Sequence, residues 1–197
     1  MEVNKLKSQL GNIDIYLLDQ ILKGKISKTD NILDAGCGSG RNLVYFNKNN
    51  YDTIGIDSDK EKILNLQNQN IGIFVHADLR KIPFNNAKFD YIICNAVLHF
   101  AKNTKDFLKM FSELYRVLKP NGTLFIRMTS IYGMEKLAIK LSDATYKLPD
   151  GTKRFLWNDM LQEKIFATYS LSFIEPIKTV NVNNLRCMTT LILKKNE

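Results

Sequence analysis

The chain has 197 residues, a length that fits one domain with room for a lid or an added segment. Hydrophobic residues make up 45% of the chain and charged residues 24%, which is typical of a soluble globular protein with a sizeable core. No apolar stretch approaches the roughly 18 to 20 residues of a membrane helix, and residues 1–22 lack the apolar centre of a signal peptide. We therefore expect a cytoplasmic protein without membrane contact.

The formal net charge is +8, from 28 basic and 20 acidic residues. A positive balance is typical of proteins that bind an anionic partner such as RNA. The lysines are scattered, however, and aromatic residues are not interleaved with them as a base-stacking surface requires. We therefore favour a solvated surface over a nucleic-acid site, and the oligomeric state is left open.

The three cysteines, Cys37, Cys94 and Cys187, are widely spaced and lie in or beside apolar runs. This spacing predicts small buried thiols rather than disulfides or metal ligands. No metal site is expected.

The first predicted element is an amphipathic helix over residues 12–23. From residue 30 to 128, short apolar runs alternate with helical patterns, which predicts a parallel sheet with helices on both faces. The predicted strands lie in NILDAG, DTIGID, IGIFVHAD, FDYIICNA and TLFIRM. The predicted helices lie over residues 41–49, 59–68 and 104–118, and Ser58 to Glu61 has the pattern of a capping box.

Residues 131–160 are less regular, and two further strands are predicted near the end of the chain. They lie in SLSFIEPIKTVNV and RCMTTLILKK and are joined by residues 183–185. So short a connection makes the two strands antiparallel.

Three glycines, Gly36, Gly38 and Gly40, follow the first strand in DAGCGSG and precede a helix. Glycines here allow a tight turn and the close approach of a ligand to the backbone. The dinucleotide fingerprint G-x-G-x-x-G would place its third glycine at position 41, which is Arg41. This argues against a nicotinamide cofactor.

Acidic residues stand at or near the ends of the first three predicted strands, at the sheet edge where open α/β folds bind ligands. Asp34 could meet an ammonium group, whereas it would repel a pyrophosphate. Asp57 could accept hydrogen bonds from both hydroxyls of a ribose. Asp78 could receive an adenine amino group, with the Leu79 N–H donating to the ring. S-adenosylmethionine has these three parts and no phosphate.

The motifs ILDAGCGSGRN, GIDSD, HADLRKIPF, FDYIICNAVLHF and LKPNGTLFIRM together resemble those of class I S-adenosylmethionine-dependent methyltransferases. The small bacterial enzymes of the tellurite-resistance and general methyltransferase type are the most similar. The resemblance covers roughly residues 30–130. It implies an α/β Rossmann-like fold with a mostly parallel seven-stranded sheet, an antiparallel last strand and helices on both faces.

The resemblance also implies how one methyltransferase domain over residues 1–197 is organised. Its expected parts are an N-terminal helical lid (1–29), a cofactor-binding core (30–130), a variable substrate-side region (131–170) and a terminal hairpin (171–197).

By this resemblance, the cofactor-binding residues fall into groups. The methionine end lies near Asp34, Gly36, Cys37, Gly38 and Gly40, the ribose near Asp57 and Ser58, the adenine near Asp78 and Leu79, and the sulfonium near Asn95 and Ala96. Simpler roles stay open for three of them. Asp57 could cap a helix, Asp78 could cap a turn, and Gly40 could serve helix packing alone.

The acceptor side is less defined, since methyl transfer from a sulfonium requires alignment and needs a base only for a protonated nucleophile. His99 is the candidate base, with local packing as the alternative. Arg127 could hold an anionic acceptor or pair with a neighbouring acid. Residues that could face the acceptor are Tyr16, Tyr132, Trp157, Asn184 and Arg186, and core packing is the favoured role of the three aromatic ones.

We therefore predict a transferase that uses S-adenosylmethionine, releases S-adenosylhomocysteine and methylates a small molecule. An RNA or protein methyltransferase is the alternative. A nicotinamide-dependent oxidoreductase and a cofactor-binding module without catalysis are less favoured.

Overall fold

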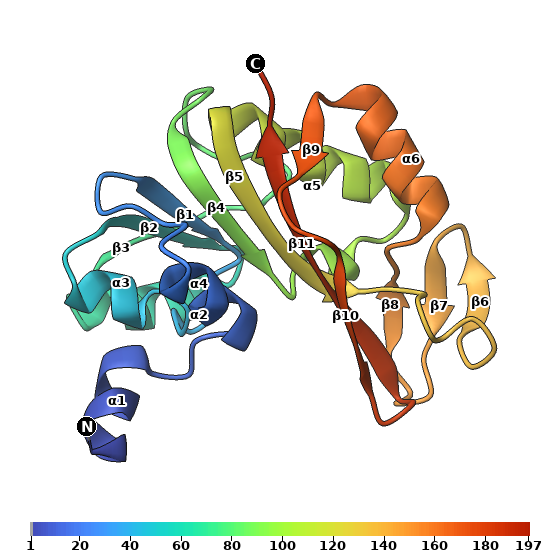
Figure 1. Ribbon diagram of the computed structural model, residues 1–197, viewed down its shortest axis with the longest axis horizontal. Helices are drawn as coiled ribbons and strands as arrows, with labels where there is room; N and C mark the ends of the chain where they lie inside the picture. The colour runs from blue at the N-terminus through green and yellow to red at the C-terminus, as the bar shows by residue number, and fades with distance from the viewer. Residues whose placement is uncertain (1) are drawn as a thin grey trace.

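The computed structural model describes residues 2–197 and contains a mostly parallel β-sheet with helices on both faces (Figure 1). The strand order is β10-β11-β5-β4-β1-β2-β3, and β9 also pairs with β11. Strands β1 to β5 are mutually parallel, whereas β11 is antiparallel to β5, β9 and β10. The strands of this sheet are β1 (Asn31–Ala35), β2 (Asp52–Asp57), β3 (Ile73–His76), β4 (Phe89–Asn95), β5 (Leu118–Thr129), β9 (Leu171–Phe173), β10 (Lys178–Val182) and β11 (Arg186–Lys195).

Two apolar clusters fix the helices to the sheet. On one face, Leu17 of α2 (Ile15–Leu22), Phe46 of α3 (Val44–Lys48) and Ile63 of α4 (Lys60–Asn68) belong to one buried cluster. On the other face, α5 (Thr104–Val117) and α6 (Asp159–Thr168) bury residues such as Phe107 and Ile165. The predicted Rossmann-like sheet with helices on both faces is therefore confirmed.

The predicted helices are present with altered ends. The helix predicted over 41–49 is shortened to α3, because residues 41–43 form turns. The capping prediction is wrong by one residue, since Asp59 and not Ser58 caps α4, accepting from the N–H groups of Glu61 and Lys62. A further helix, α1 (Val3–Leu10), precedes α2 and buries none of its residues.

The strand predicted in SLSFIEPIKTVNV is interrupted. It forms β9 and β10, which pair with the same edge of β11 on either side of Glu175 and Pro176. Proline has no N–H to donate to a neighbouring strand, which accounts for the break. The seven predicted strand positions are thus occupied, with the edge position divided between two short strands.

Residues 131–170 contain a second, three-stranded antiparallel sheet and α6. The sheet consists of β6 (Ile139–Ser142), β7 (Thr145–Lys147) and β8 (Lys153–Phe155). After β8, Trp157 forms an isolated bridge with Ser130 just past the end of β5. Strand β8 also lies next to the short 3₁₀ helix η1 (Leu98–Phe100), so this sheet stands beside the carboxyl ends of β4 and β5.

Within residues 2–197, no helix is long and apolar enough to cross a membrane.

Candidate functional site

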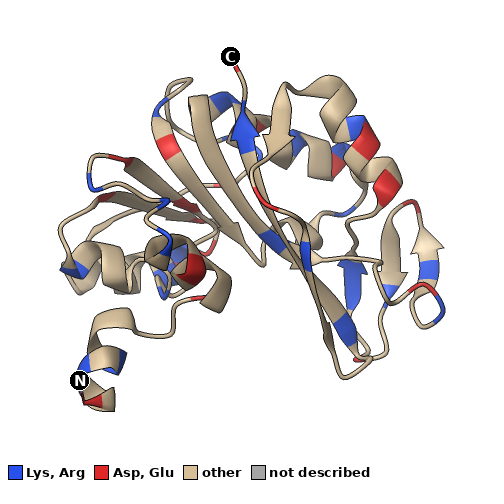
Figure 2. Ribbon diagram, in the orientation of Figure 1, with Lys and Arg blue, Asp and Glu red and all other residues tan. Residues whose placement is uncertain are grey.

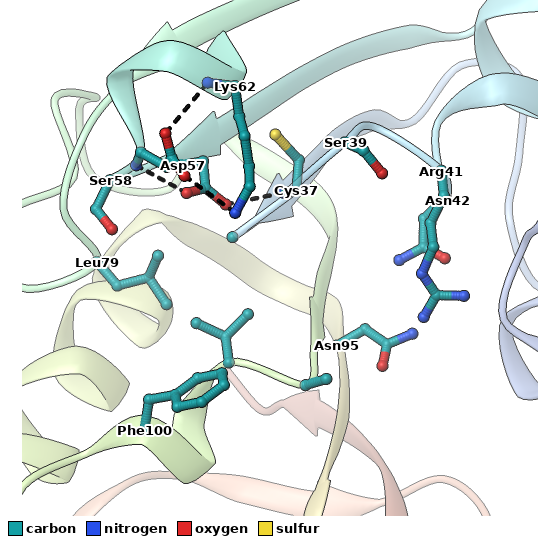
Figure 3. A pocket seen from close by; sticks show the side chains of 15 residues that line it. Cys37, Ser39, Arg41, Asn42, Asp57, Ser58, Lys62, Leu79, Asn95 and Phe100 are labelled. Carbon is teal, nitrogen blue, oxygen red and sulfur yellow. Dashed lines mark hydrogen bonds and ion pairs between the residues drawn. The ribbon is translucent and has the colours of Figure 1, made fainter.

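A cavity of about 530 Å³ lies at the carboxyl ends of β1, β2 and β4. Figure 3 shows Asp57 and Ser58 at one end of this cavity and Arg41 and Asn95 at the other. The predicted cofactor residues that line it are Gly36, Cys37, Gly38, Asp57, Ser58, Leu79, Asn95 and Ala96. The remaining lining residues, which were not predicted, are Ser39, Arg41, Asn42, Asp59, Lys62, Val97 and Phe100.

The glycine loop forms one wall of the cavity. A Cβ atom at Gly36 would overlap the side chain of Val97, whereas a Cβ at Gly38 would meet no atom within 4 Å. The backbone at Gly38 therefore borders open space in which a ligand can approach it. Gly40 differs, because it does not line the cavity and its Cβ would lie 3.0 Å from Leu66 Cδ2. Gly40 thus serves close packing against α4.

Asp57 lies beside the glycine loop and holds it in place. Its Oδ2 accepts from the Gly38 N–H at 2.8 Å, and its Oδ1 accepts from the Asp59 N–H at 2.9 Å. Each carboxylate oxygen can still accept a further hydrogen bond. Asp57 therefore supports the turn into α4, as the simpler reading proposed, and also remains open to a ligand.

Asp34 lies behind the glycine loop, not on the cavity wall. Its carboxyl group is fully buried, and neither oxygen has a hydrogen-bond partner within residues 2–197. Burial raises the pKa of Asp34 to about 7, against the opposing field of the Arg41 guanidinium. An unpartnered buried carboxyl group is costly, and a nearby ligand cation would relieve the cost.

Asp78 does not line the cavity. Its Oδ1 accepts from the Arg80 N–H at 2.7 Å, and the carboxylate pairs with the Arg80 guanidinium at 3.1 Å. Arg80 in turn pairs with Asp106, whose pKa it lowers to about 2. Asp78 thus caps a turn, and its contact with adenine stays a prediction. Of the two residues predicted to contact the adenine, Asp78 and Leu79, only Leu79 lines the cavity.

Asn95 and Ala96 close the cavity at the end of β4. The Asn95 side chain is 7% exposed, and neither its Oδ1 nor its Nδ2 has a partner within residues 2–197. Ala96 has a φ of 61° and donates its N–H to the Arg127 carbonyl oxygen at 2.7 Å. A positive φ is costly for alanine, and such strain is found often at functional sites.

His99 does not line the cavity, and its role as a base stays a prediction. Its ring is buried and contacts Phe100 edge-on with 4.5 Å between ring centres. Burial lowers the pKa of His99 to about 4, and the charges of Arg154 and Arg186 act in the same direction. The alternative of local packing therefore fits the geometry better than general-base catalysis.

Arg127 forms an ion pair with Asp14. Pairing with a neighbouring acid was the predicted alternative to binding an anionic acceptor. Its Nη1 donates to Asp14 Oδ2 at 2.9 Å, and Asp14 also caps α2. The Tyr16 ring lies 5.2 Å from the guanidinium carbon. Sequence reasoning missed Asp14, because an aspartate before a helix is indistinguishable from an ordinary cap.

The other residues predicted to face the acceptor lie away from the cavity. Trp157 is fully buried in the core, and Tyr132 donates its hydroxyl to Asp159 at 2.7 Å. Asn184 is exposed in the β10–β11 turn and accepts from Asn181 Nδ2. Arg186 pairs with Asp150 at 3.2 Å. Core packing, the favoured role of the aromatic residues, holds for Trp157.

Arg41 lines the cavity, although the sequence analysis did not include it among the cofactor-binding residues. It occupies the position of the third glycine in the dinucleotide fingerprint, and its guanidinium extends along the cavity towards Asn95 (Figure 3). It donates to the Asn12 carbonyl oxygen at 2.9 Å and lies 4.0 Å from Asp14. The departure from the glycine pattern was the available signal.

The sheet order, the antiparallel last strand and a ligand cavity beside a glycine loop define the class I methyltransferase fold. Residues 33–126 match the family described as "Methyltransferase domain". Over these residues the chain is therefore similar to the class I S-adenosylmethionine-dependent methyltransferases, a family whose cofactor is S-adenosylmethionine.

Individual relatives agree with this assignment. A Bacillus subtilis (strain 168) protein named YqeM is 25% identical over 159 residues, covering 77% of this chain and 63% of its own length. Demethylmenaquinone methyltransferase of Staphylococcus aureus (strain MRSA252) is 27% identical over 144 residues, covering 65% and 57%. The chain thus spans less than two thirds of the length of either protein.

Solved structures share the fold. The 1,6-didemethyltoxoflavin-N1-methyltransferase of Burkholderia thailandensis, solved with 1,6-didemethyltoxoflavin and S-adenosylhomocysteine, has a TM-score of 0.70 and 15% identity to this chain. The match covers 98% of this chain and 82% of that one.

Proposed function

We propose that this protein transfers the methyl group of S-adenosylmethionine to a small-molecule acceptor. The observation that carries the proposal is the Asp34 carboxyl group, buried without a partner behind an open glycine loop. A phosphate-bearing dinucleotide would not relieve this group, whereas the ammonium of an amino-acid tail would. Asp57 lines the cavity and accepts a hydrogen bond from the Gly38 N–H, 19 residues before it in the chain. Asp57 would therefore meet the ribose of such a cofactor, and Asp34 would meet its ammonium group.

The residues would hold the cofactor as follows. Asp57 and Ser58 would bind the ribose hydroxyls, and Leu79 would contact the adenine. Asp34 would balance the ammonium group, and Arg41, at the end of the cavity away from Asp57, would pair with the carboxylate. Arginine and a carboxylate form strong charge-assisted hydrogen bonds.

S-adenosylmethionine supplies a methyl group on a positively charged sulfur, which is already a good leaving group. The chain therefore has to align the acceptor with the cofactor rather than activate the methyl group, and alignment alone contributes several kcal/mol. In this proposal residues 1–29 form the lid and residues 131–170 the acceptor side, since α2 approaches Arg127 through Asp14 and β8 lies beside η1.

A small acceptor is favoured over RNA for two reasons. Lysine and arginine are spread over many elements (Figure 2), and the basic residues that line the cavity are Arg41 and Lys62. In addition, the names of demethylmenaquinone methyltransferase and of the toxoflavin enzyme describe small-molecule acceptors. RNA methylation would instead predict RNA binding that weakens steeply with salt.

Thermal unfolding in the presence of S-adenosylmethionine, S-adenosylhomocysteine and NAD⁺ tests the proposal. Ligands that bind only the folded state raise its stability, so the first two should stabilise the protein and NAD⁺ should not. Asp57→Ala should weaken binding of S-adenosylhomocysteine in calorimetry while circular dichroism keeps its folded signal. Stabilisation by NAD⁺ alone would contradict the cofactor assignment.

A further inference from the structure

Three side chains that each contain a buried polar atom without a hydrogen-bond partner lie next to one another on the face of the sheet that carries α2. Asn95 ends β4, Arg127 is its in-register neighbour on β5, and Thr190 is the neighbour of Arg127 on β11. The Asn95 amide, Arg127 Nε and the Thr190 hydroxyl are all buried, and none has a partner within residues 2–197. A buried polar atom without a partner destabilises the folded protein, so the row is suited to a ligand that supplies partners.

Arg127 already binds one carboxylate of the chain itself. Its Nη1 donates to Asp14, and its guanidinium rests against the Tyr16 ring. The opposite edge, formed by Nε and Nη2, makes no hydrogen bond within the described residues. That edge presents two parallel N–H groups, the geometry that binds a carboxylate through both oxygens.

The cavity offers little to a nucleophile that arrives protonated. None of its described lining residues is a histidine or a tyrosine. Burial and the neighbouring acids raise the pKa of the Cys37 thiol, and both Asp57 oxygens already accept backbone N–H groups at the other end of the cavity. Asp14 is held between two arginines, Arg127 and Arg41. An acceptor that is ionised at neutral pH needs none of these groups as a base.

We propose that the methyl acceptor is a small carboxylic acid, bound as its carboxylate by the Nε–Nη2 edge of Arg127 with the Asn95 amide beside it. This inference rests on the proposed methyltransferase function. One carboxylate oxygen forms the bond to the methyl carbon, the carbon–sulfur bond breaks, and its electron pair remains on sulfur. The products are a methyl ester and S-adenosylhomocysteine, and no proton is transferred.

Calorimetry on the full chain saturated with S-adenosylhomocysteine tests this proposal. The probes are sodium benzoate and sodium acetate, each compared with its neutral amide, benzamide or acetamide. We expect both carboxylates to bind about tenfold or more tightly than their amides, since only the anions gain charge-assisted hydrogen bonds. Equal binding of each acid and its amide would overturn the proposal.

Four variants locate the site. Arg127→Gln should remove the preference for carboxylates, and Arg127→Lys should keep part of it, because lysine has the charge without the fork. Asp14→Asn should tighten benzoate binding several-fold, since a competing charge is removed. Arg154→Gln is the matched control, because the Arg154 guanidinium stacks on the cavity residue Phe100 at 4.8 Å and has no acidic partner within the described residues.

Two outcomes in this series would refute the assignment. Loss of the preference in Arg154→Gln, or its survival in Arg127→Gln, would place the carboxylate elsewhere. The affinity for S-adenosylhomocysteine separates the two proposals. If the unmodified protein does not bind it, the methyltransferase function fails. If Arg127→Gln weakens S-adenosylhomocysteine but not 5′-methylthioadenosine, Arg127 holds the cofactor's own carboxylate and the acceptor inference fails alone.

Discussion

Asp34→Asn should stabilise the cofactor-free protein at alkaline pH and at the same time weaken its binding of S-adenosylhomocysteine. Asp34 is fully buried without a hydrogen-bond partner, and burial raises its pKa from 3.8 to about 7. The folded state therefore holds this proton more tightly than the unfolded state does. Consequently the contribution of Asp34 to the free energy of unfolding is greatest below pH 4, falls as the pH rises from about 4 to 7, and stays low above pH 7.

The magnitude follows from the same two pKa values. One pKa unit corresponds to 1.36 kcal/mol, so the ionised carboxylate destabilises the folded protein by about 4 kcal/mol above pH 7. Asparagine has a similar shape and no charge, and it should recover about 2–4 kcal/mol at pH 8 but only about 1–2 kcal/mol at pH 5, where the loss is still incomplete. For a chain of this size, 1 kcal/mol shifts the melting temperature by roughly 2–4 °C.

Urea unfolding at pH 5 and pH 8, combined with calorimetry of S-adenosylhomocysteine, measures both effects. In the unmodified protein the affinity should rise between pH 6 and pH 8, because the ammonium group binds the ionised carboxylate. In Asp34→Asn the affinity should fall about tenfold or more, and its rise with pH should disappear. A variant that is no more stable at pH 8 and binds the ligand as tightly as before would refute this reasoning.

Three further predictions concern Arg41, His99 and Trp157. Arg41→Gln should weaken S-adenosylhomocysteine about tenfold in calorimetry and leave 5′-methylthioadenosine unchanged, since only the former has a carboxylate; equal effects on both ligands would exclude the pairing. His99→Gln should leave the shape of the pH–rate profile between pH 6 and 9 unchanged, because the pKa of His99 is about 4 and its ring is already neutral there; loss of a titration step in this range would restore it as a base. Trp157→Ala should destabilise the protein by about 3–5 kcal/mol in urea unfolding. It should leave the dissociation constant of S-adenosylhomocysteine unchanged, and a weakened constant would contradict a purely structural role.

Local patterns in the sequence were sufficient to predict the sheet and the position of its ligand edge. The five strands predicted between residues 30 and 128 correspond to β1 to β5, because apolar runs that must be buried on both faces can form little else. The same holds for the glycine loop, since Gly36 and Gly38 both have the positive φ that such a turn requires. Eight of the predicted cofactor residues therefore line the cavity.

The direction and partners of the polar side chains were decided by the tertiary structure alone. Arg127 meets Asp14, which lies 113 residues away in the sequence. Arg80 pairs with its near neighbour Asp78, but it is also held by Asp106, 26 residues further along the chain. A carboxylate at a strand end has the same local pattern whether it faces a cavity or an arginine. The hydrophobic period specifies which face of an element is buried, whereas hydrogen bonds and charges are satisfied only when distant segments come together.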